Sequence, residues 1–383
     1  MRYHFVLWQG GLRLLGIAFL AEQRVSWLSL ISIDQDRKKV MVKSAVSRLR
    51  LSVLDQSPIS EGSTLGVALR NSIDLAVLAE SLGYHRYWVA EHHGSPGFGC
   101  MSPEILIGPI AAATSRIRVG SGGVMLPHYS PFKVAENFSM LASLFPGRID
   151  LGVGRASGTG RATALALQRD RRLPPADDFP DQLTELISYC GTVEQRSAQG
   201  MPPANLVTHE RPHLWLLGSS AQSAVWAADL GLSYAFADFI NAHGGEDAVT
   251  EHYREQFKPR AKQPKSETAV AVWAICAETD EEANVLASSV KMLILCLQRG
   301  ELIPVPSPQN AAQFLVEHAK RPGTLPMQRR IVVGTPEVVK DGIEAIAAEY
   351  EADEVLIVNI VYDHAARKRC YQLIANAFGL AGT

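Results

Sequence analysis

The chain has 383 residues, a length that suits one large α/β barrel or two smaller domains. Hydrophobic residues make up 47% of it, and 37 Lys and Arg are balanced by 39 Asp and Glu, for a formal net charge of -2. This balance argues against a nucleic-acid partner, which needs a concentrated positive field. The five cysteines are odd in number and lack metal-binding spacing. We therefore expect no disulfide framework, no metal site and a cytoplasmic location.

The first 48 residues differ from the rest of the chain. The stretch 5–33 is apolar, but Arg13, Glu22 and Arg24 interrupt it, so that no clean run reaches the ~18 residues of a membrane helix. A secretory signal would need a small-x-small cleavage site after its apolar run, and Glu22 follows instead. We expect residues 1–48 to be a poorly ordered leader without a membrane role, and residues 49–383 to form the folded domain.

From residue 51 onward, short β-rich runs alternate with longer amphipathic stretches, a pattern typical of a parallel sheet with crossover helices. Strands are predicted at 51–55, 86–90, 117–120, 149–153, 213–217, 233–236, 269–276 and 354–359. Helices are predicted at 65–82, 103–114, 131–144, 178–190, 220–230, 245–256, 280–298, 336–349 and 364–378. Eight strands close a barrel, so the predicted fold is an α/β (β/α)8 TIM-like barrel. The stretches 156–210 and 299–330 are expected to be long insertion loops.

An open, doubly wound sheet is the competing architecture. It would carry a GxGxxG turn directly after its first strand. The nearest candidate, residues 152–158, follows the fourth predicted strand, has Ser157 at the last glycine position and leads into no helix. The sequence therefore favours the barrel.

In such a barrel the chemistry lies at the carboxyl ends of the strands. The second predicted strand is followed by Glu91, His92 and His93. Because side chains alternate along an extended chain, Glu91 and His93 should point one way and His92 the other. His92 can then face the barrel mouth while its neighbours fix the loop. On residue types alone, a simple hydrogen-bonded loop histidine remains the alternative.

The third and fourth predicted strands also end in unusual residues. Gly122 and Gly123 remove side chains where something flat must approach the backbone, although a plain β-bulge would use them too. Arg155 sets a permanent positive charge among small residues, which suits a phosphate, although a solvated surface arginine is the ordinary alternative.

The fifth predicted strand runs through Gly218 into a helix whose start carries Ser219, Ser220 and Ser223. Free backbone N–H groups and the positive end of the helix dipole favour an anion there. Serine as a plain N-cap explains one of the three. Together with Arg155, this turn would offer one phosphate donors from two strands.

Taken together, these residues resemble the bacterial-luciferase-like, flavin-dependent monooxygenases, from about residue 51 to residue 380. The motifs that carry the resemblance are, in order, LSVLDQSPISEGST, GYHRYWVAEHH, VGSGGVMLPHYSP, FPGRIDLGVGRASG, WLLGSS with VWAADLGL, VGTPE and DEVLIVNIVYDHAAR. Any one of them could occur by chance, whereas their common order and spacing are specific. The resemblance also implies a TIM-like barrel.

The resemblance implies roles for the candidate residues. His92, flanked by Glu91 and His93, matches the family's catalytic histidine. Gly122 and Gly123 match a cis peptide against the flavin ring, with Met125 beside them. The FMN phosphate site is matched by Arg155, Gly218, Ser219, Ser220 and Ser223.

The implied function is oxygenation of a small organic substrate, such as an aldehyde or ketone, by O2 and reduced FMN supplied by a separate flavin reductase, in a homodimer. Gly154 stands where the luciferases have a reactive cysteine, and Ser219 replaces an acidic residue. We therefore expect the non-luminescent branch with a single type of subunit. A deazaflavin-dependent hydride transfer and a non-catalytic flavin-binding protein are the alternatives.

Overall fold

The computed structural model describes residues 49–155, 161–168, 178–191, 210–241, 247–260, 263–320 and 330–380. The predicted leader, residues 1–48, lies outside the described residues, as do parts of the predicted loops 156–210 and 299–330.

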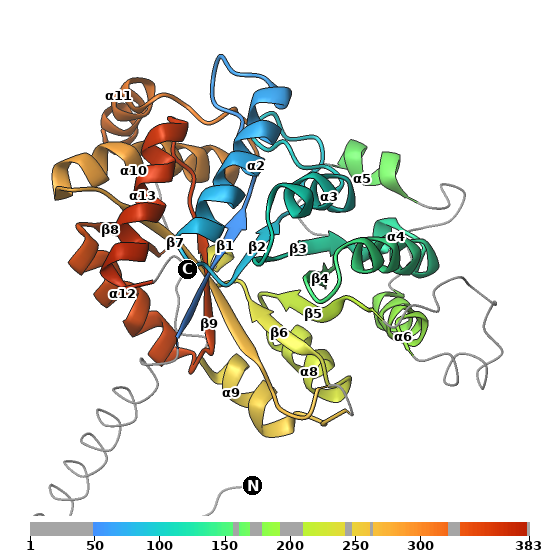
Figure 1. The fold of residues 1–383 in the computed structure, drawn as a ribbon. Helices are drawn as coiled ribbons and strands as arrows, with labels where there is room; N and C mark the ends of the chain where they lie inside the picture. Colours follow the sequence, from blue (N-terminus) through green and yellow to red (C-terminus); the bar gives the residue numbers. More distant parts are fainter. Residues whose placement is uncertain are drawn as a thin grey trace, which may run out of the picture. The chain divides into compact units, whose positions relative to one another are not determined.

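Eight parallel strands close into a barrel, which confirms the predicted fold (Figure 1). The strands of the described residues are β1 (Arg50–Asp55), β2 (Arg86–Val89), β3 (Arg118–Met125), β4 (Ile149–Gly154), β5 (His213–Gly218), β6 (Ser233–Phe236), β7 (Thr268–Cys276), β8 (Ile331–Gly334) and β9 (Glu354–Val358). Neighbours pair in chain order from β1 to β7, and β9 joins β7 to β1. The open-sheet alternative is therefore excluded.

The short strand β8 was not predicted from the sequence. It pairs with the last four residues of β7, from Trp273 to Cys276, beyond most of the stretch that pairs with β9. The barrel thus closes through β9, and β8 extends one side of β7. Four apolar residues without alternation give no periodic signal, which explains why the sequence did not reveal this strand.

Helices surround the strands in the order of the chain, from α2 in blue to α13 in red (Figure 1). They are α2 (Leu65–Ser81), α3 (Pro103–Ala113), α4 (Pro131–Leu144), α5 (Arg161–Leu167), α6 (Phe179–Tyr189), α8 (Ala221–Asp229), α9 (Asp247–Gln256), α10 (Asp280–Gln298), α11 (Pro308–Ala319), α12 (Pro336–Glu349) and α13 (His364–Ala377). Two short 3-10 helices, η1 (Leu126–His128) and η2 (Asp238–Ile240), follow β3 and β6.

The ends of the predicted helices agree closely with the structure, because local signals set them. Helices α3, α4 and α12 begin at a proline, whose missing N–H costs nothing in the first turn. Helix α10 is capped by Thr279, whose side chain accepts from the backbone of Glu282. The prediction of 299–330 as a loop was wrong over residues 308–319, where α11 forms, and α5 likewise lies inside the predicted loop 156–210.

Alternation along each strand divides the core into two layers. Outward side chains such as Val53 and Tyr87 pack under the helices. Inward side chains such as Leu54, Trp88 and Trp215 fill the barrel, and the two tryptophan rings meet edge to face with centroids 5.2 Å apart. The barrel is therefore packed through its middle, as expected for eight strands.

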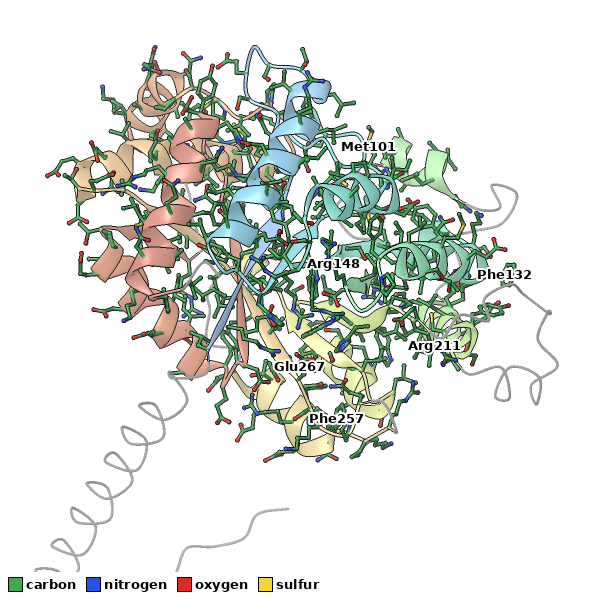
Figure 2. The ribbon with its side chains drawn as sticks, in the orientation of Figure 1. Met101, Phe132, Arg148, Arg211, Phe257 and Glu267 are labelled. Carbon is green, nitrogen blue, oxygen red and sulfur yellow. The ribbon has the colours of Figure 1, made fainter. Side chains whose placement is uncertain are left out.

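The amino-terminal end of the barrel is closed by a buried ion cluster. Arg86, 1% exposed at the start of β2, donates to Glu354 at 2.7 Å, to Asp150 at 3.0 Å and to Glu267 at 3.3 Å. Glu267, labelled in Figure 2, comes directly before β7. The guanidinium also lies 4.6 Å from the centroid of Trp215. One cation thus joins strands from around the barrel.

A second buried ion pair ties the last helix to the first strand. Arg367 of α13 donates to Asp55 at 2.6 Å, and both side chains are almost fully buried. Tyr87 donates to the other oxygen of Asp55 at 2.6 Å, and the backbone N–H of Ser57 donates to the first at 2.7 Å. The carboxyl end of β1 is therefore held in one position.

We predict that Asp150→Asn lowers the free energy of unfolding at pH 7 by about 3–5 kcal/mol, because Arg86 would lose a buried partner. Urea denaturation measures this. As a control, Lys133→Met breaks the exposed pair with Glu136 and should cost at most about 1 kcal/mol. If both substitutions lowered the free energy of unfolding equally, the buried ion cluster of Arg86 would not stabilise the barrel more than an exposed ion pair does.

The same effect should depend on pH. Burial alone would raise the pKa of Asp150, but Arg86 and Arg118 outweigh burial and lower it to about 2. The stability that this carboxylate contributes is complete above the pKa of about 4 that it has in the unfolded chain, and is lost as the pH falls towards 2. The difference in the free energy of unfolding between wild type and Asp150→Asn should therefore become smaller as the pH falls from 4 to 2.

Candidate functional site

The carboxyl ends of β2, β3, β4 and β5 bring together the regions that carry the predicted site residues. These four strands are consecutive neighbours in the barrel. Residues that directly follow them therefore share one rim, which is where barrel enzymes hold their reactive groups.

Glu91 fixes the loop after β2. Its carboxylate is buried and accepts from Nε2 of His93 at 2.6 Å, from the hydroxyl of Tyr129 at 2.8 Å and from the backbone N–H of Met125 at 3.0 Å. These contacts connect the loop after β2 to the end of β3 and to the segment that follows it. As the alternation predicted, Glu91 and His93 lie on the same side.

His92 lies apart from this network. Its ring packs against Phe98, with centroids 4.5 Å apart, and its Nδ1 is buried with no hydrogen-bond partner. Burial, with a smaller contribution from His93, lowers the pKa of His92 to about 4. The imidazole is therefore neutral at pH 7, with one N–H and one lone pair.

The peptide bond between Gly122 and Gly123 is cis, as the resemblance implied. Both positions also require glycine for packing. A Cβ on Gly122 would lie 2.5 Å from Leu54 and 3.2 Å from Trp88, and one on Gly123 would lie 2.8 Å from the carbonyl oxygen of Gly152. The register between β3 and β4 shifts at this point, so the β-bulge is present as well.

Arg155 lies against helix α8. The guanidinium of Arg155 is 5.9 Å from the ring centroid of Trp226 on α8. Ser220 is the N-cap residue, and its side chain makes no capping hydrogen bond. The first backbone N–H groups of α8 therefore lack a side-chain cap, and Arg155 adds a positive charge against the same helix, a combination that suits an anion.

Ser223 has a different environment from the other serines of this turn. It is 7% exposed, and its hydroxyl lies 2.6 Å from the carbonyl oxygen of Ser220 and 2.9 Å from the hydroxyl of Tyr234. It also packs against Gly218, where a Cβ would collide with the Ser223 side chain. Ser223 thus stabilises the turn, whereas Ser219 and Ser220 are more open to solvent.

Several contributors were not singled out from the sequence. Tyr129 binds Glu91, Phe98 packs on His92, and Trp226 lies beside Arg155. His128 has its ring centroid 5.9 Å from that of His93. Tyr129 and His128 fall inside the motif VGSGGVMLPHYSP, which is far from Glu91 in the sequence. Only the closed barrel brings these residues together, so no spacing rule could connect them.

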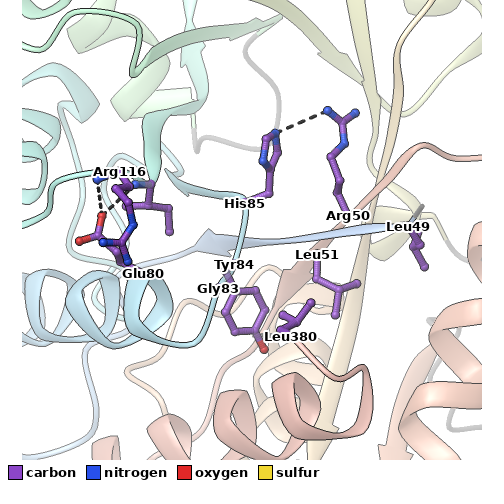
Figure 3. A pocket seen from close by; sticks show the side chains of 10 residues that line it. Leu49, Arg50, Leu51, Glu80, Gly83, Tyr84, His85, Arg116 and Leu380 are labelled. Carbon is purple, nitrogen blue, oxygen red and sulfur yellow. Dashed lines mark hydrogen bonds between the residues drawn. The ribbon is translucent and has the colours of Figure 1, made fainter. Parts of the chain in front are cut away.

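A cavity of about 380 Å³ lies at the opposite end of the barrel, beside Arg50, Glu80, Tyr84, His85 and Arg116 (Figure 3). These residues lie at or near the amino ends of β1, β2 and β3. The Glu80 carboxylate there accepts from three successive backbone N–H groups, those of residues 115–117, and so closes a loop. The sequence-predicted site residues lie at the other end of the barrel, on the carboxyl rim.

Within the described part of the chain, no helix is long and apolar enough to cross a bilayer, and no three His, Cys, Asp or Glu side chains gather as metal ligands would. All five cysteines lie within the described residues, and none of them forms a disulfide bond there.

The closed parallel barrel with its surrounding helices defines the (β/α)8-barrel class of proteins. Residues 49–353 match the profile of the family described as luciferase-like monooxygenase, and the chain belongs to this family.

Similar proteins cover nearly the same part of the chain. The uncharacterized protein YwcH of Bacillus subtilis is 43% identical over 86% of this chain and 98% of its own length. The N-acetyl-S-alkylcysteine monooxygenase of the same organism is 37% identical over 86% of this chain and 98% of its own length. The solved structure of apo-MsnO8 is 38% identical, with a TM-score of 0.78, over 87% of this chain and 99% of that chain.

Proposed function

We propose that this protein is an FMN-dependent monooxygenase, which uses reduced FMN and O2 to oxygenate a small organic substrate such as an aldehyde or ketone. The observation that carries the proposal is the contact of Arg155 with helix α8, whose N-cap serine makes no capping hydrogen bond, on the rim where the cis peptide and His92 also lie. The N-acetyl-S-alkylcysteine monooxygenase among the relatives supports it.

The residues present fit this cofactor. Arg155 and the backbone N–H groups at Ser219 and Ser220 would hold the phosphate, and the cis peptide between Gly122 and Gly123, which the sequence resemblance matches to the ring site, would lie against the flat ring. When bound, the reduced flavin supplies two electrons and the site at which O2 is activated. The protein contributes orientation and exclusion of water.

His92 would manage a proton at the substrate. With its pKa lowered to about 4, the ring is neutral at pH 7, so one nitrogen can donate a hydrogen bond to the substrate and the other can accept one. Glu91 holds His93, Tyr129 and Met125, so the loop that carries His92 is preorganised without a charge on His92 itself.

Reduced FMN would arrive from a separate flavin reductase. The first strand continues into Gln56, Ser57 and Pro58, without the glycine-rich turn of a dinucleotide fold. A diffusible reduced flavin is therefore part of the proposal.

Incubation with reduced FMN, ¹⁸O2 and a panel of aldehydes and ketones should place one ¹⁸O atom in the product, as read by mass spectrometry. His92→Ala should slow product formation by about 100-fold or more and leave FMN affinity unchanged, because the ring moves a proton and does not hold the cofactor. His252→Ala, on the exposed face of α9, is the control.

Unchanged turnover of His92→Ala would remove this residue from the mechanism. Substrate oxidation by a deazaflavin without oxygen uptake would favour hydride transfer over oxygenation, and flavin binding without any turnover would favour a carrier.

Arg155→Ala should weaken binding of FMN by about 10- to 100-fold and leave binding of riboflavin nearly unchanged, because riboflavin lacks the phosphate that the guanidinium contacts. Titration followed by flavin fluorescence measures both. Arg211, labelled in Figure 2, precedes β5 at the opposite end of the barrel, and Arg211→Ala is the control. Equal losses for the two ligands would contradict the phosphate role.

We further propose a homodimer that covers the neighbouring helices α3 and α4. Ile105, Met140 and Leu144 are 72%, 64% and 68% exposed there, a concentration of apolar surface that a partner would bury. Light scattering should give the mass of two chains for wild type and of one chain for Ile105→Glu. Val316→Glu on α11 is the control, and a monomeric wild type would contradict the proposal.

A further inference from the structure

The proposed function leaves one buried polar side chain at the rim unused. Gln56 directly follows β1 and is 3% exposed. Its Nε2 is buried and has no hydrogen-bond partner. Buried amides are nearly always paired, so this group indicates a contact that the protein alone does not make.

The side chain of Gln56 belongs to the inner face of the barrel. Leu54 is part of the barrel interior, and the next residue, Asp55, points outward to Arg367 and Tyr87. Alternation along the strand therefore turns Gln56 inward, one level above Leu54.

Gln56 lies at the same height along the barrel axis as the proposed site for the flavin ring. Asp55 pairs with Val89 on β2, and Val89 pairs with Ser121 on β3. Continued by one residue along each strand, this register would place Gln56 beside Ala90 and then Gly122. The Ala90 side chain offers no hydrogen-bonding group, and Gly122 has no side chain.

The backbone around Gln56 is fixed. On one side of it Asp55 is bound by Arg367 and Tyr87, and on the other the N–H of Ser57 donates to the same carboxylate. The N–H of Ala90 also donates to the carbonyl oxygen of Asp55, at 2.9 Å. The amide is thus a preorganised group, the kind of support that a recognition residue needs.

We propose that Gln56 hydrogen-bonds the polar edge of the flavin's pyrimidine ring, where carbonyl oxygens alternate with an N–H. This inference rests on the proposed function. A primary amide donates and accepts, so it matches such an edge in either orientation. The phosphate site follows β4 and β5, whereas Gln56 follows β1, so the two groups would hold opposite ends of one cofactor across β2 and β3.

The test compares Gln56→Leu with wild type for FMN and riboflavin. The variant should bind both ligands about 10-fold more weakly, equivalent to about 1.4 kcal/mol, because both carry the ring. Arg155→Ala, in contrast, should affect FMN alone. The infrared carbonyl bands of the bound flavin should shift in Gln56→Leu, which reports the lost hydrogen bond directly.

Stability separates recognition from a structural role. Without ligand, Gln56→Leu should be at least as stable to urea as wild type, since it removes an unpaired buried donor. A structural role would lower the stability and leave the ring affinity of the folded protein unchanged. Ser289→Ala on α10 is the control. It removes a buried hydroxyl that also has no hydrogen-bond partner, and it should leave flavin binding unchanged.

Unchanged affinity and unchanged carbonyl bands in Gln56→Leu, with wild type binding FMN, would overturn the inference and leave the proposed function intact. If wild type binds a deazaflavin and not FMN, the same comparison applies, because both rings share this edge. If wild type binds neither ring, the inference and the proposed function both fail. Should Gln56→Leu not fold, Gln56→Met decides, since its side chain has nearly the same length as glutamine, has no N–H to donate and must show the same loss of ring affinity.

Discussion

The buried guanidinium of Arg86 is the contact on which the barrel depends. Through Asp150, Glu354 and Glu267 it joins the starts of β4, β9 and β7 to β2, so it acts across the barrel where backbone ladders connect only neighbours. A lone buried charge would be costly, and only the full set of partners makes this arrangement stable. The amino-terminal end of the barrel is thereby rigid and charged.

This cluster divides the barrel into two ends with different tasks. Trp88 and Trp215 lie above it and separate it from the rim. Trp88 donates to Asp150 at 2.9 Å, so the tryptophan layer is itself positioned by the cluster. Chemistry at the carboxyl rim can then use loops and small residues while the opposite end supplies the stability.

At the carboxyl rim, a few local contacts, and not the overall charge of the protein, would hold an anionic ligand. A formal net charge of -2 would not attract an anionic cofactor, but one arginine beside a helix start can hold a phosphate. Glu91 positions its loop through three hydrogen bonds, and Asp55 fixes the end of β1 in the same way. The buried carboxylates of Glu91 and Asp55, through their hydrogen bonds to other protein groups, thus position the neighbouring residues that would face the ligand.

The sequence by itself determined the eight strands that close the barrel, most helix ends and the residues that follow each strand, because alternation, prolines and N-caps are local signals. It also indicated His92, Arg155 and the α8 turn. It did not reveal β8 or α11, whose patterns are short or lie within a loop-like composition. Only the tertiary structure decided that Tyr129 binds Glu91, that Ser223 supports its turn and that Gln56 lies buried and unpaired, because closing the barrel brings distant residues into contact.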